Sequence, residues 1–400
     1  MANNELIPDI RFVGFSEPWE QRRLSDVSDV RDGTHDSPPY QSEGHPFVTS
    51  KNVKDGYINY DDIQFISDEY FEAINRRSKV DVNDILMGMI GTIGNLALIR
   101  TEPDFAIKNV ALIKDTKQVS YLYLYSYLQS PNTERQLISG LDGGTQKFVS
   151  LKKIRELNIL VPSEEEQIKV GTFIESLDNL ITLHQRKLEK LQAIKRSMLE
   201  KMFPRDGSSF PEIRFAGFTD PWEQRKFGDV FEEYSEKKHD ELPPLTIIQG
   251  RGTIPRELSD RNLQYDKSNL AGYKMVKKGD FIVHLRSFEG GLEKANTNGI
   301  ISPAYHTFHG INTDTRFYYP FFRSRWFIDI LLKPHVYGIR DGRSINIEGM
   351  KTILIPVPNY EEQKIIGDLI EGLDTLINLY HRKLKLLQAI KRSMLEKMFV

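Results

Sequence analysis

The sequence predicts an α+β fold in which two similar mixed α/β domains are separated by two long helices, packed as an antiparallel coiled coil, with an internal pseudo-two-fold duplication. Three observations predict it. LQAIKRSMLEKMF at positions 191–203 returns unchanged at 387–399. IRFVGFSEPWEQRRLSDV at 10–27 returns as IRFAGFTDPWEQRKFGDV at 213–230. Apolar residues at helical spacing precede each copy of the first repeat, so each half should end in the same long helix.

The duplication covers whole modules. Residues 183–203 and 379–399 are identical at seventeen of twenty-one positions with a constant offset of 196. A period near 200 is too long for a solenoid repeat, which spans about 20–50 residues. Residues 28–148 and 231–344, between the repeated ends, hardly align. A common frame therefore holds two different inserts, and such a protein should contact two different things.

These limits divide the chain into four parts. The first mixed α/β domain is expected at 1–162 and the first long helix at 163–204, followed by the second domain at 205–358 and the second helix at 359–400.

Composition indicates a soluble globular protein, with 39% hydrophobic and 28% charged residues. No stretch resembles a membrane span or an apolar signal segment, so no membrane partner is expected. The absence of cysteine excludes disulfides and thiolate metal sites and favours the reducing cytoplasm. A net charge of −2 argues against a protein that coats nucleic acid by positive charge alone. Any DNA contact should be local, or shared with a basic partner.

The long helices should carry a heptad seam. Apolar residues recur at steps of three and four, interrupted in the first copy by His184 and Lys195. At about 1.5 Å rise per residue, thirty-odd residues make a rod of roughly 50 Å. We assign the helix-pairing and partner-binding role to eight seam residues: Leu177, Ile181, Leu188, Leu191, Leu373, Ile377, Leu384 and Leu387.

Charge predicts the direction of packing. Each helix begins acidic, as in Glu164 to Glu166, and ends basic, as in Lys195, Arg196 and Lys201. Antiparallel packing sets each acidic half against a basic half, whereas parallel packing would set like charges together. The alternative is that the split only complements each helix dipole. Because exposed pairs contribute little stability, charge should select orientation while apolar packing holds the helices together.

Each insert contains short strand-like runs. In the first these are PFVTSKNV at 46–53, GYINY at 56–60, DILMGMIG at 84–91 and LALIR at 96–100; in the second they are LTIIQG at 245–250, GDFIVHLR at 279–286 and ILIPVP at 353–358. YLYLYSYLQS at 121–130 fits a strand or a helix, and we favour a helix. Gly91 and Gly94 are too few for a dinucleotide fingerprint and are interpreted as structural.

Loop residues that suit phosphates and base edges are Arg, Lys, Asn, Gln and small hydroxyls. The DNA-binding candidates are Arg31, Thr34, His35, Lys51, Asn52, Arg76 and Arg77 in the first domain, with Gln249, Arg251, Arg286, Arg340 and Arg343 in the second. Each of them is alternatively a solvated loop side chain.

Ser37 to Tyr40, SPPY, resembles the short motif with which amino-methyltransferases hold a flipped base, so an adenine methyltransferase is a rival hypothesis. That enzyme also needs a glycine-rich loop for its methyl donor within a doubly wound sheet, and neither pattern is found. A proline-stiffened turn explains SPPY more simply. The sequence has no HExxH, phosphate-loop or GxSxG motif, and its histidines do not cluster at ligand spacing. No catalytic residue and no metal ligand is expected.

The chain resembles the specificity subunits of type I restriction-modification systems over nearly its full length. The resemblance rests on the doubled arrangement, PWEQRR and PWEQRK, VPSEEEQ and VPNYEEQ before the long helices, and LQAIKRSMLEKMF at their ends. RDGTHDSPPY, SFEGG and GIISPAY are similar to patterns in that family's target recognition domains.

The resemblance implies a subunit without enzymatic activity, in which each variable domain reads one part of a split double-stranded DNA target. The helices would space the domains and bind two modification (methyltransferase) subunits. No cofactor is expected in this chain, because the methyl donor, Mg and ATP would belong to the modification and restriction (translocase and nuclease) subunits. Rod length would then determine the gap between half-sites, as in any bivalent binder on a rigid spacer.

A coiled-coil adaptor whose two domains bind proteins is the remaining alternative. It would lack a salt-dependent, sequence-selective affinity for DNA.

Overall fold

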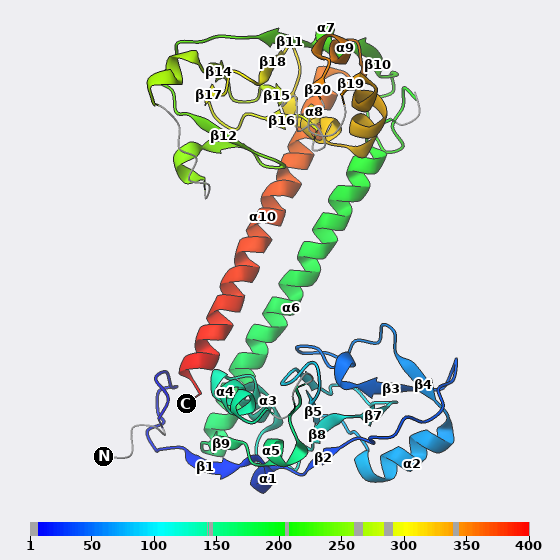
Figure 1. Ribbon diagram of the computed structural model, residues 1–400, viewed down its shortest axis with the longest axis vertical. Coiled ribbons are helices and arrows are strands. Elements are labelled where there is room, and N and C mark those ends of the chain that lie inside the picture. The colour runs from blue at the N-terminus through cyan, green and yellow to red at the C-terminus, as the bar shows by residue number, and fades with distance from the viewer. Residues whose placement is uncertain are drawn as a thin grey trace. The chain divides into compact units, whose positions relative to one another are not determined.

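The computed structural model describes residues 7–141, 143, 147–204, 208–259, 267–283, 291–338 and 344–399 (Figure 1). The chain forms two compact units, one of residues 1–185 with 382–400 and one of residues 186–381. Each unit therefore contains one mixed domain, the first half of the helix that follows it and the second half of the other long helix. The predicted mixture of α and β structure is confirmed.

The described residues of the first unit form three small sheets. Its helices are α1 (Leu24–Val27), α2 (Asp68–Ser78), α3 (Tyr121–Leu128), α4 (Pro131–Ser139) and α5 (Leu151–Arg155), with a 3-10 turn, η2, at Ser50–Asn52. Its strands are β1 (Glu20–Arg23), β2 (Val30–Asp32), β3 (His45–Thr49), β4 (Gln64–Ile66), β5 (Ile85–Gly88), β6 (Leu96–Leu98), β7 (Ala106–Lys108), β8 (Val110–Ile113) and β9 (Asn158–Val161). Their strand orders are β2-β8-β5-β6, β4-β3-β7 and β1-β9, and β3 and β7 are parallel.

Two sequence-based assignments in this domain have clear outcomes. Residues 121–128 form the helix α3, as favoured above. The strand predicted at 56–60 is wrong, because only Ile58 makes an isolated bridge, to Val53. The backbone N–H of Lys54 donates to the carbonyl of Tyr57 and closes a turn, and Tyr57 itself is exposed. The β-favouring residues of this segment therefore lie in a loop.

The second unit has a different set of strands. Its helices are α7 (Phe227–Val230), α8 (Thr315–Phe322) and α9 (Ile347–Lys351), with the shorter turns η3 (Arg256–Leu258), η4 (Lys267–Gly272) and η7 (Lys333–His335) and a π-helical segment, η6 (Trp326–Leu332). Its strands are β10 (Glu223–Lys226), β11 (Phe231–Tyr234), β12 (Leu245–Ile248), β13 (Gly252–Pro255), β14 (Lys274–Val276), β15 (Phe281–Val283), β16 (Glu293–Lys294), β17 (Gly299–Ile301), β18 (His306–Gly310), β19 (Val336–Tyr337), β20 (Ser344–Ile345) and β21 (Leu354–Val357). The largest sheet has the order β11-β18-β15-β16.

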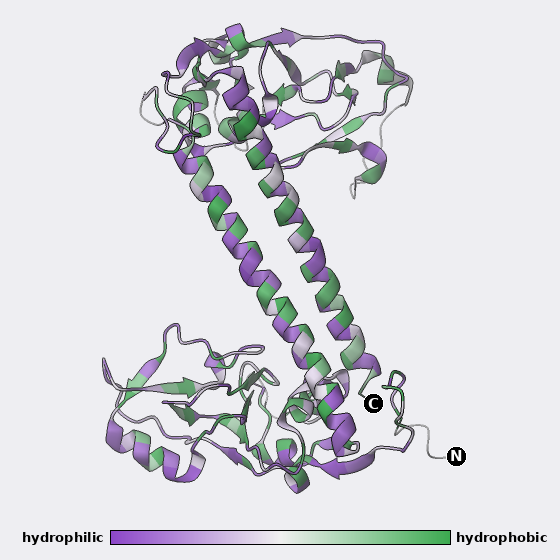
Figure 2. Ribbon diagram, turned by 180° about the vertical axis from the view of Figure 1, so that it is seen from behind, coloured by the Kyte–Doolittle hydropathy of each residue, from purple (hydrophilic) through white to green (hydrophobic). Residues whose placement is uncertain are grey.

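The long helices are α6 (Glu164–Lys201) and α10 (Tyr360–Lys397), each of 38 residues. Figure 2 shows hydrophilic and hydrophobic residues alternating along both, as an amphipathic helix requires. Among the described helices, none is sufficiently apolar over a sufficient length to cross a membrane.

A buried cluster of Arg11, Trp19 and Glu166 fixes the start of α6. Glu166 is fully buried; it accepts hydrogen bonds from Arg11 Nε at 2.7 Å and Nη2 at 2.8 Å, and from Trp19 Nε1 at 3.2 Å. The hydrogen bonds to Glu166 raise the pKa of Arg11 above its ordinary value, although burial opposes this. A buried carboxylate with three donors is well compensated, so it fixes the angle at which the helix leaves the domain.

The second half repeats this cluster with Arg214, Trp222 and Glu362. Here Arg214 donates at 2.7 Å and 2.8 Å and Trp222 at 3.1 Å, and Glu362 is again fully buried. The two units therefore share the same chemistry at the same point of each long helix. The repeated PWEQR motif supplies the tryptophan, and the repeated EEQ motif supplies the glutamate.

The glutamine of each EEQ motif joins helix and domain. Gln167 donates to the carbonyl of Pro162 at 2.9 Å and accepts from the backbone N–H of Ser120 at 2.8 Å. Gln363 donates to Pro358 at 2.9 Å and accepts from Asp314 at 3.0 Å. Both side chains are buried, so each satisfies two backbone groups that would otherwise lie unpaired.

The end of each long helix packs on the opposite cluster. The ring of Phe399 contacts Trp19 at a centroid distance of 6.4 Å, and that of Phe203 contacts Trp222 at the same distance. The backbone N–H of Ile10 donates to Lys397 and that of Ile213 to Lys201, both at 3.0 Å. One junction thus joins consecutive parts of the chain, and the other joins its two distant ends.

Two equivalent ion pairs connect the long helices. Asp178 of α6 lies 2.6 Å from Lys391 of α10 in the first unit, and Lys195 pairs with Asp374 in the second. The offset of 196 relates Asp178 to Asp374 and Lys195 to Lys391. An acidic position early in one helix therefore faces a basic position late in the other, in both units.

Candidate nucleic-acid interface

Two of the first-domain candidates contact the buried carboxylate of Asp32, at the end of β2. Arg77 of α2 pairs with Asp32 Oδ1, and His35 Nε2 lies 3.0 Å from Asp32 Oδ2. His35 Nδ1 is 2.7 Å from Asn109 Oδ1. Arg31 donates to the carbonyl of Arg77 at 3.1 Å, which ties β2 to the end of α2. Residues 31 and 35 thus form one polar cluster with residue 77, which is distant from them in sequence.

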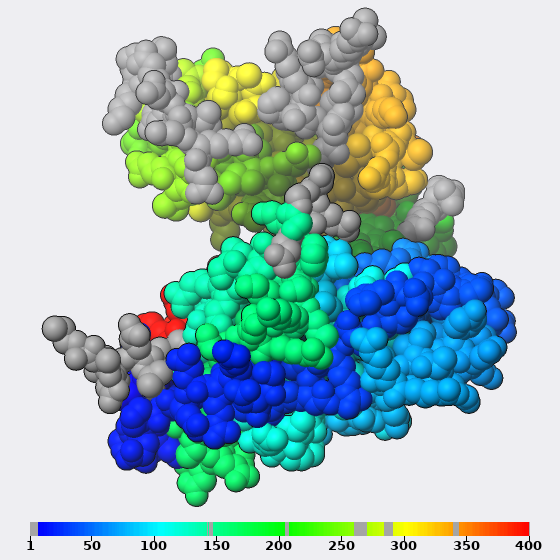
Figure 3. Space-filling model, turned by 60° about the horizontal axis from the view of Figure 1, so that its bottom comes forward, coloured from blue at the N-terminus to red at the C-terminus, as the bar shows by residue number. Residues whose placement is uncertain are grey.

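The cations of this cluster are paired with carboxylates but remain accessible. Arg31 Nη2 lies 2.6 Å from Asp29, and this hydrogen bond raises the pKa of Arg31. The side chain of Arg77 is 67% exposed. The pair of Arg31 with Asp29 is exposed, and such pairs contribute about 0–1 kcal/mol, so a phosphate replaces that carboxylate at small cost. The carboxylate of Asp32 is buried, so removing Arg77 from it would leave an unpaired buried charge. In Figure 3 the blue surface of the N-terminal segment adjoins the lighter blue surface that includes α2.

The remaining first-domain candidates differ in position. Lys51 and Arg76 are exposed, and Thr34 is half-buried, with its hydroxyl accepting from the N–H of Asp36 at 3.1 Å. Asn52 is 2% exposed. Its amide donates to Asn59 O at 3.0 Å and accepts from the N–H of Thr49 at 3.0 Å. In this conformation Asn52 holds a turn and presents no surface to a ligand.

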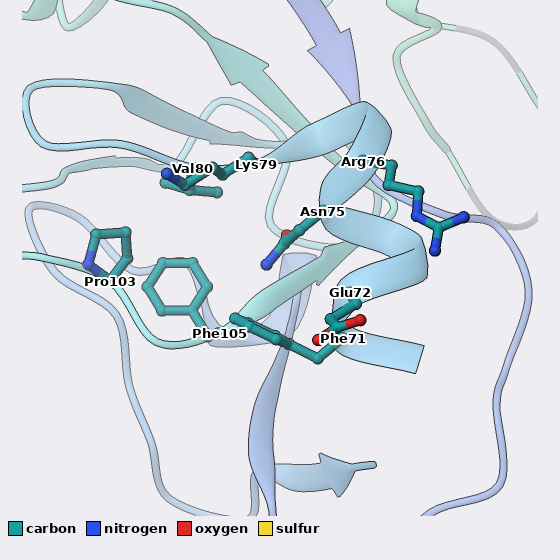
Figure 4. A pocket seen from close by; sticks show the side chains of 8 residues that line it. All are labelled: Phe71, Glu72, Asn75, Arg76, Lys79, Val80, Pro103 and Phe105. Atoms are coloured by element: carbon teal, nitrogen blue, oxygen red, sulfur yellow. The ribbon is translucent and has the colours of Figure 1, made fainter. Parts of the chain in front are cut away.

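A small cavity borders α2 (Figure 4). It has a volume of about 400 Å³ and is lined by Phe71, Glu72, Asn75, Arg76, Lys79, Val80, Pro103 and Phe105. Figure 4 shows the Arg76 side chain directed away from the aromatic residues. Asn75 Oδ1 is buried and has no hydrogen-bond partner among the described residues. The mainly apolar lining suggests no reaction chemistry.

The second-domain candidates Gln249 and Arg251 lie in the loop between β12 and β13, and both are exposed. Arg286, Arg340 and Arg343 lie outside the described residues. Sequence reasoning placed Gln249 and Arg251 in one loop, but it missed Glu293, whose buried carboxylate accepts from the backbone of that loop. The sequence offered no signal for Glu293, because a glutamate in a short strand is usually solvated.

The seam residues assigned to partner binding are wholly or partly covered in the structure. Leu177, Leu188 and Leu373 are buried, and Ile181, Leu191, Ile377, Leu384 and Leu387 are half-buried. Side chains covered in this way have little surface left for another protein. Other leucines of the long helices are exposed: Leu180, Leu183, Leu376, Leu379 and Leu386. Helical periodicity predicts an apolar face, but it does not tell which side chains remain uncovered.

Within the described ranges, no group of three or more His, Asp or Glu side chains could hold a metal ion. Burial raises the pKa of Tyr123 well above its ordinary value and that of Tyr127 to about 12, so both hydroxyls stay protonated. Tyr123 donates to the carbonyl of Leu160, which is a structural role. The described tyrosines of this core therefore support the fold.

Comparisons with known proteins agree with this arrangement. Residues 16–193 match the family model of the Type I restriction modification DNA specificity domain. The type I restriction enzyme MjaVIII specificity subunit of Methanocaldococcus jannaschii is 24% identical over 402 residues, which cover 95% of this chain and 91% of that protein. The EcoKI specificity subunit of Escherichia coli K12 is 22% identical over 189 residues, or 44% of this chain and 40% of that protein.

A solved structure shares the fold. The crystal structure of the Type-I restriction-modification system S subunit from M. genitalium superposes with a TM-score of 0.63 and 14% identity, over 98% of this chain and 99% of that chain. The matched domain and the shared fold are thus similar to those of type I DNA specificity subunits. These similarities support the type I restriction-modification specificity subunit that the resemblance of its motifs predicted.

Proposed function

We propose that this chain is the DNA sequence-recognition subunit of a type I restriction-modification complex, and that each variable domain reads one half of a bipartite, asymmetric DNA target. One observation carries the proposal: the same buried Arg, Trp and Glu cluster holds two unlike domains. The first domain contains the parallel pair β3 and β7, whereas the second contains the antiparallel hairpin β12 and β13. Unlike domains on equivalent supports suit two unlike half-sites.

The long helices are the spacer in this proposal. They pack as an antiparallel coiled coil, and their length determines the gap between the half-sites. The equivalent pairs Asp178 with Lys391 and Lys195 with Asp374 support this orientation, because a parallel pair would oppose like charges. The buried seam leucines support it as well, since they supply the apolar packing that isolated ion pairs do not.

Two modification subunits dock on equivalent surfaces of the helices. Leu180 and Leu183 of α6 are 43% and 59% exposed, and their counterparts at the offset of 196, Leu376 and Leu379 of α10, are each 44% exposed. Exposed leucines in the same place on both copies suit two molecules of one partner. Adding the restriction subunits completes the complex.

The chemistry of the complex is assigned to the partners. The methyl donor, Mg and ATP bind the modification and restriction subunits, and this chain contributes specificity alone. We place the complex in the cytoplasm, because a chain without cysteine forms no disulfides and needs no oxidising compartment.

Methylome sequencing tests the proposal. The chain is expressed with its modification subunit in a host that lacks DNA methylation, and modified adenines are mapped by single-molecule sequencing. We expect methylation within one split, asymmetric motif. Absence of methylation despite a stable complex with the modification subunit would refute the DNA-reading role and favour the protein adaptor.

Native mass spectrometry tests the docking surface. Changing Leu180 and Leu183 to Asp should reduce a complex with two modification subunits to one with a single subunit, and adding Leu376→Asp and Leu379→Asp should abolish it. Leu386→Asp is the control, because Leu386 is 61% exposed but its counterpart in the first copy is Lys190. Retention of both subunits by the first variant would contradict the assignment of this surface.

A further inference from the structure

The loop between β12 and β13 is a tight hairpin turn. Ile248 and Gly252 are the last paired residues, and the N–H of Arg251 donates to the carbonyl of Ile248 at 2.9 Å. Gly250 and Gly252 have φ angles of +82° and +74°, which residues other than glycine rarely adopt. The three loop residues Gln249, Gly250 and Arg251 therefore adopt one closed conformation.

The carboxylate of Glu293, in β16, holds this turn by accepting hydrogen bonds from its backbone. Glu293 is 6% exposed, and its carboxylate accepts from the N–H of Gly250 at 2.8 Å and of Gly252 at 3.1 Å. It also accepts from the Tyr319 hydroxyl at 2.8 Å and pairs with Arg323. Four donors use the acceptor capacity of a carboxylate. Glu293 is thus committed to the protein and has none left for a ligand.

A second group holds the turn at its other edge. Asn296 Nδ2 donates to the carbonyls of Arg251 at 2.7 Å and Thr253 at 3.0 Å, and its backbone N–H donates to Thr253 Oγ1 at 3.0 Å. A Cβ added to Gly252 would lie 2.4 Å from the carbonyl oxygen of Lys294, so the turn backbone packs directly on the strand beneath it. The backbone of the turn is held on both sides.

The side chains of Gln249 and Arg251 are the exposed part of this assembly. Within the described residues, neither has a hydrogen-bond partner for its polar end. A solvent-facing hairpin does not require a buried carboxylate and four donors beneath it, because burial of a charge is costly even when it is paired. A recognition element does require such support, since its side chains must be held in a fixed place before the ligand arrives.

These two side chains have the chemistry to read bases. Glutamine makes two hydrogen bonds to the N6 and N7 edge of adenine, and arginine makes two to O6 and N7 of guanine, both in the major groove. We propose that the turn at Gln249–Arg251 is a base-reading element of the second domain, with Gln249 on adenine and Arg251 on guanine, and that Glu293 is the positioning residue that holds it. The inference rests on the proposed function of this chain.

The test uses the full chain with its modification subunit and compares the methylated motif of each variant with that of the wild type. Gln249→Ala should make one adenine of the second half-site degenerate, and Arg251→Ala one guanine, with discrimination falling by about tenfold to hundredfold. Both side chains are exposed, so neither change should affect folding. Arg251→Lys should retain overall DNA binding but lose the guanine preference, because lysine lacks the planar fork.

Glu293→Gln should lower discrimination at both of these base positions while the other bases of the half-site keep theirs. A merely structural glutamate would weaken all bases of that half-site equally, which would overturn its positioning role. Combining Glu293→Gln with Arg251→Ala should cost no further guanine discrimination, since both act through one contact.

Failures of the two proposals can be separated. If the wild type methylates one split motif and both alanine variants keep that motif complete, the base-reading turn is wrong while the recognition function stands. If the wild type methylates no motif, the recognition function fails, and the inference fails with it.

Discussion

Replacing Glu166 by Gln tests whether the buried cluster holds the first long helix to its domain. The substitution preserves size but removes the charge that compensates the Arg11 guanidinium, whose side chain is only 10% exposed. Two hydrogen bonds from Arg11 and one from Trp19 converge on this carboxylate. An amide can accept on one atom only, so at least one donor loses its partner.

The magnitude follows from this geometry. Breaking a buried ion pair by removing one partner costs about 3–5 kcal/mol, because the remaining charge stays buried without compensation. We expect about 3 kcal/mol for an isosteric change. In a unit of roughly 200 residues, 1 kcal/mol corresponds to about 2–4 °C in melting temperature, so the first unit should melt about 6–12 °C earlier.

Differential scanning calorimetry measures this change, since it can resolve the transitions of two units. Glu165→Gln is the matched control, because Glu165 is the exposed neighbour and its replacement alters the net charge equally. Glu362→Gln should produce the same loss in the second unit, with Glu361→Gln as its control. The reasoning is refuted if Glu166→Gln lowers the melting temperature no more than Glu165→Gln does.

Three further predictions concern the helices and the pH dependence of stability. Asp178→Lys should lower the free energy of unfolding by about 1 kcal/mol, because it places two lysines together at Lys391, and adding Lys391→Asp should restore it. Urea unfolding followed by circular dichroism measures both changes. A double variant less stable than either single variant would contradict the pairing. Inserting one heptad after Lys187 and one after Lys383 lengthens each helix by about 10 Å. The gap in the methylated motif should then grow by about three base pairs, and the bases of both half-sites should stay the same. Altered bases with an unchanged gap would refute the spacer role. Burial acts to raise the pKa of Glu233, but hydrogen bonds from Lys351 and His306 outweigh it and lower the pKa below the usual 4.5. Its contribution to stability is therefore complete above about pH 4.5 and is lost as the pH falls through the lower folded-state pKa; melting curves from about pH 6 to pH 3 should show a smaller acid loss for Glu233→Gln, and an equal loss would contradict this reading.

Much of the frame could be predicted from the sequence because its signals are local and repeated. Apolar residues that recur every three or four positions predict the long helices. The acidic and basic halves of these helices predict which of their ends lie together. The strand predicted at 56–60 was wrong because a short run of β-favouring residues also occurs in a loop whose turns satisfy the backbone. The DNA-binding role of the candidate arginines stays a prediction, since exposure and charge do not distinguish a base contact from a solvated side chain.

The sequence by itself determined that the protein is built twice, that each half ends in an amphipathic helix, and that the two variable domains differ. Only the tertiary structure decided how distant residues meet, as Arg11 and Glu166 do across 155 positions. It also decided which apolar side chains stay exposed, since Leu177 and Leu180 are alike in sequence but one is buried and the other is not. The physical reason is that periodicity specifies a face of a helix, whereas burial depends on what packs against that face. A buried glutamate such as Glu293 is likewise recognisable only from the donors that the fold brings to it.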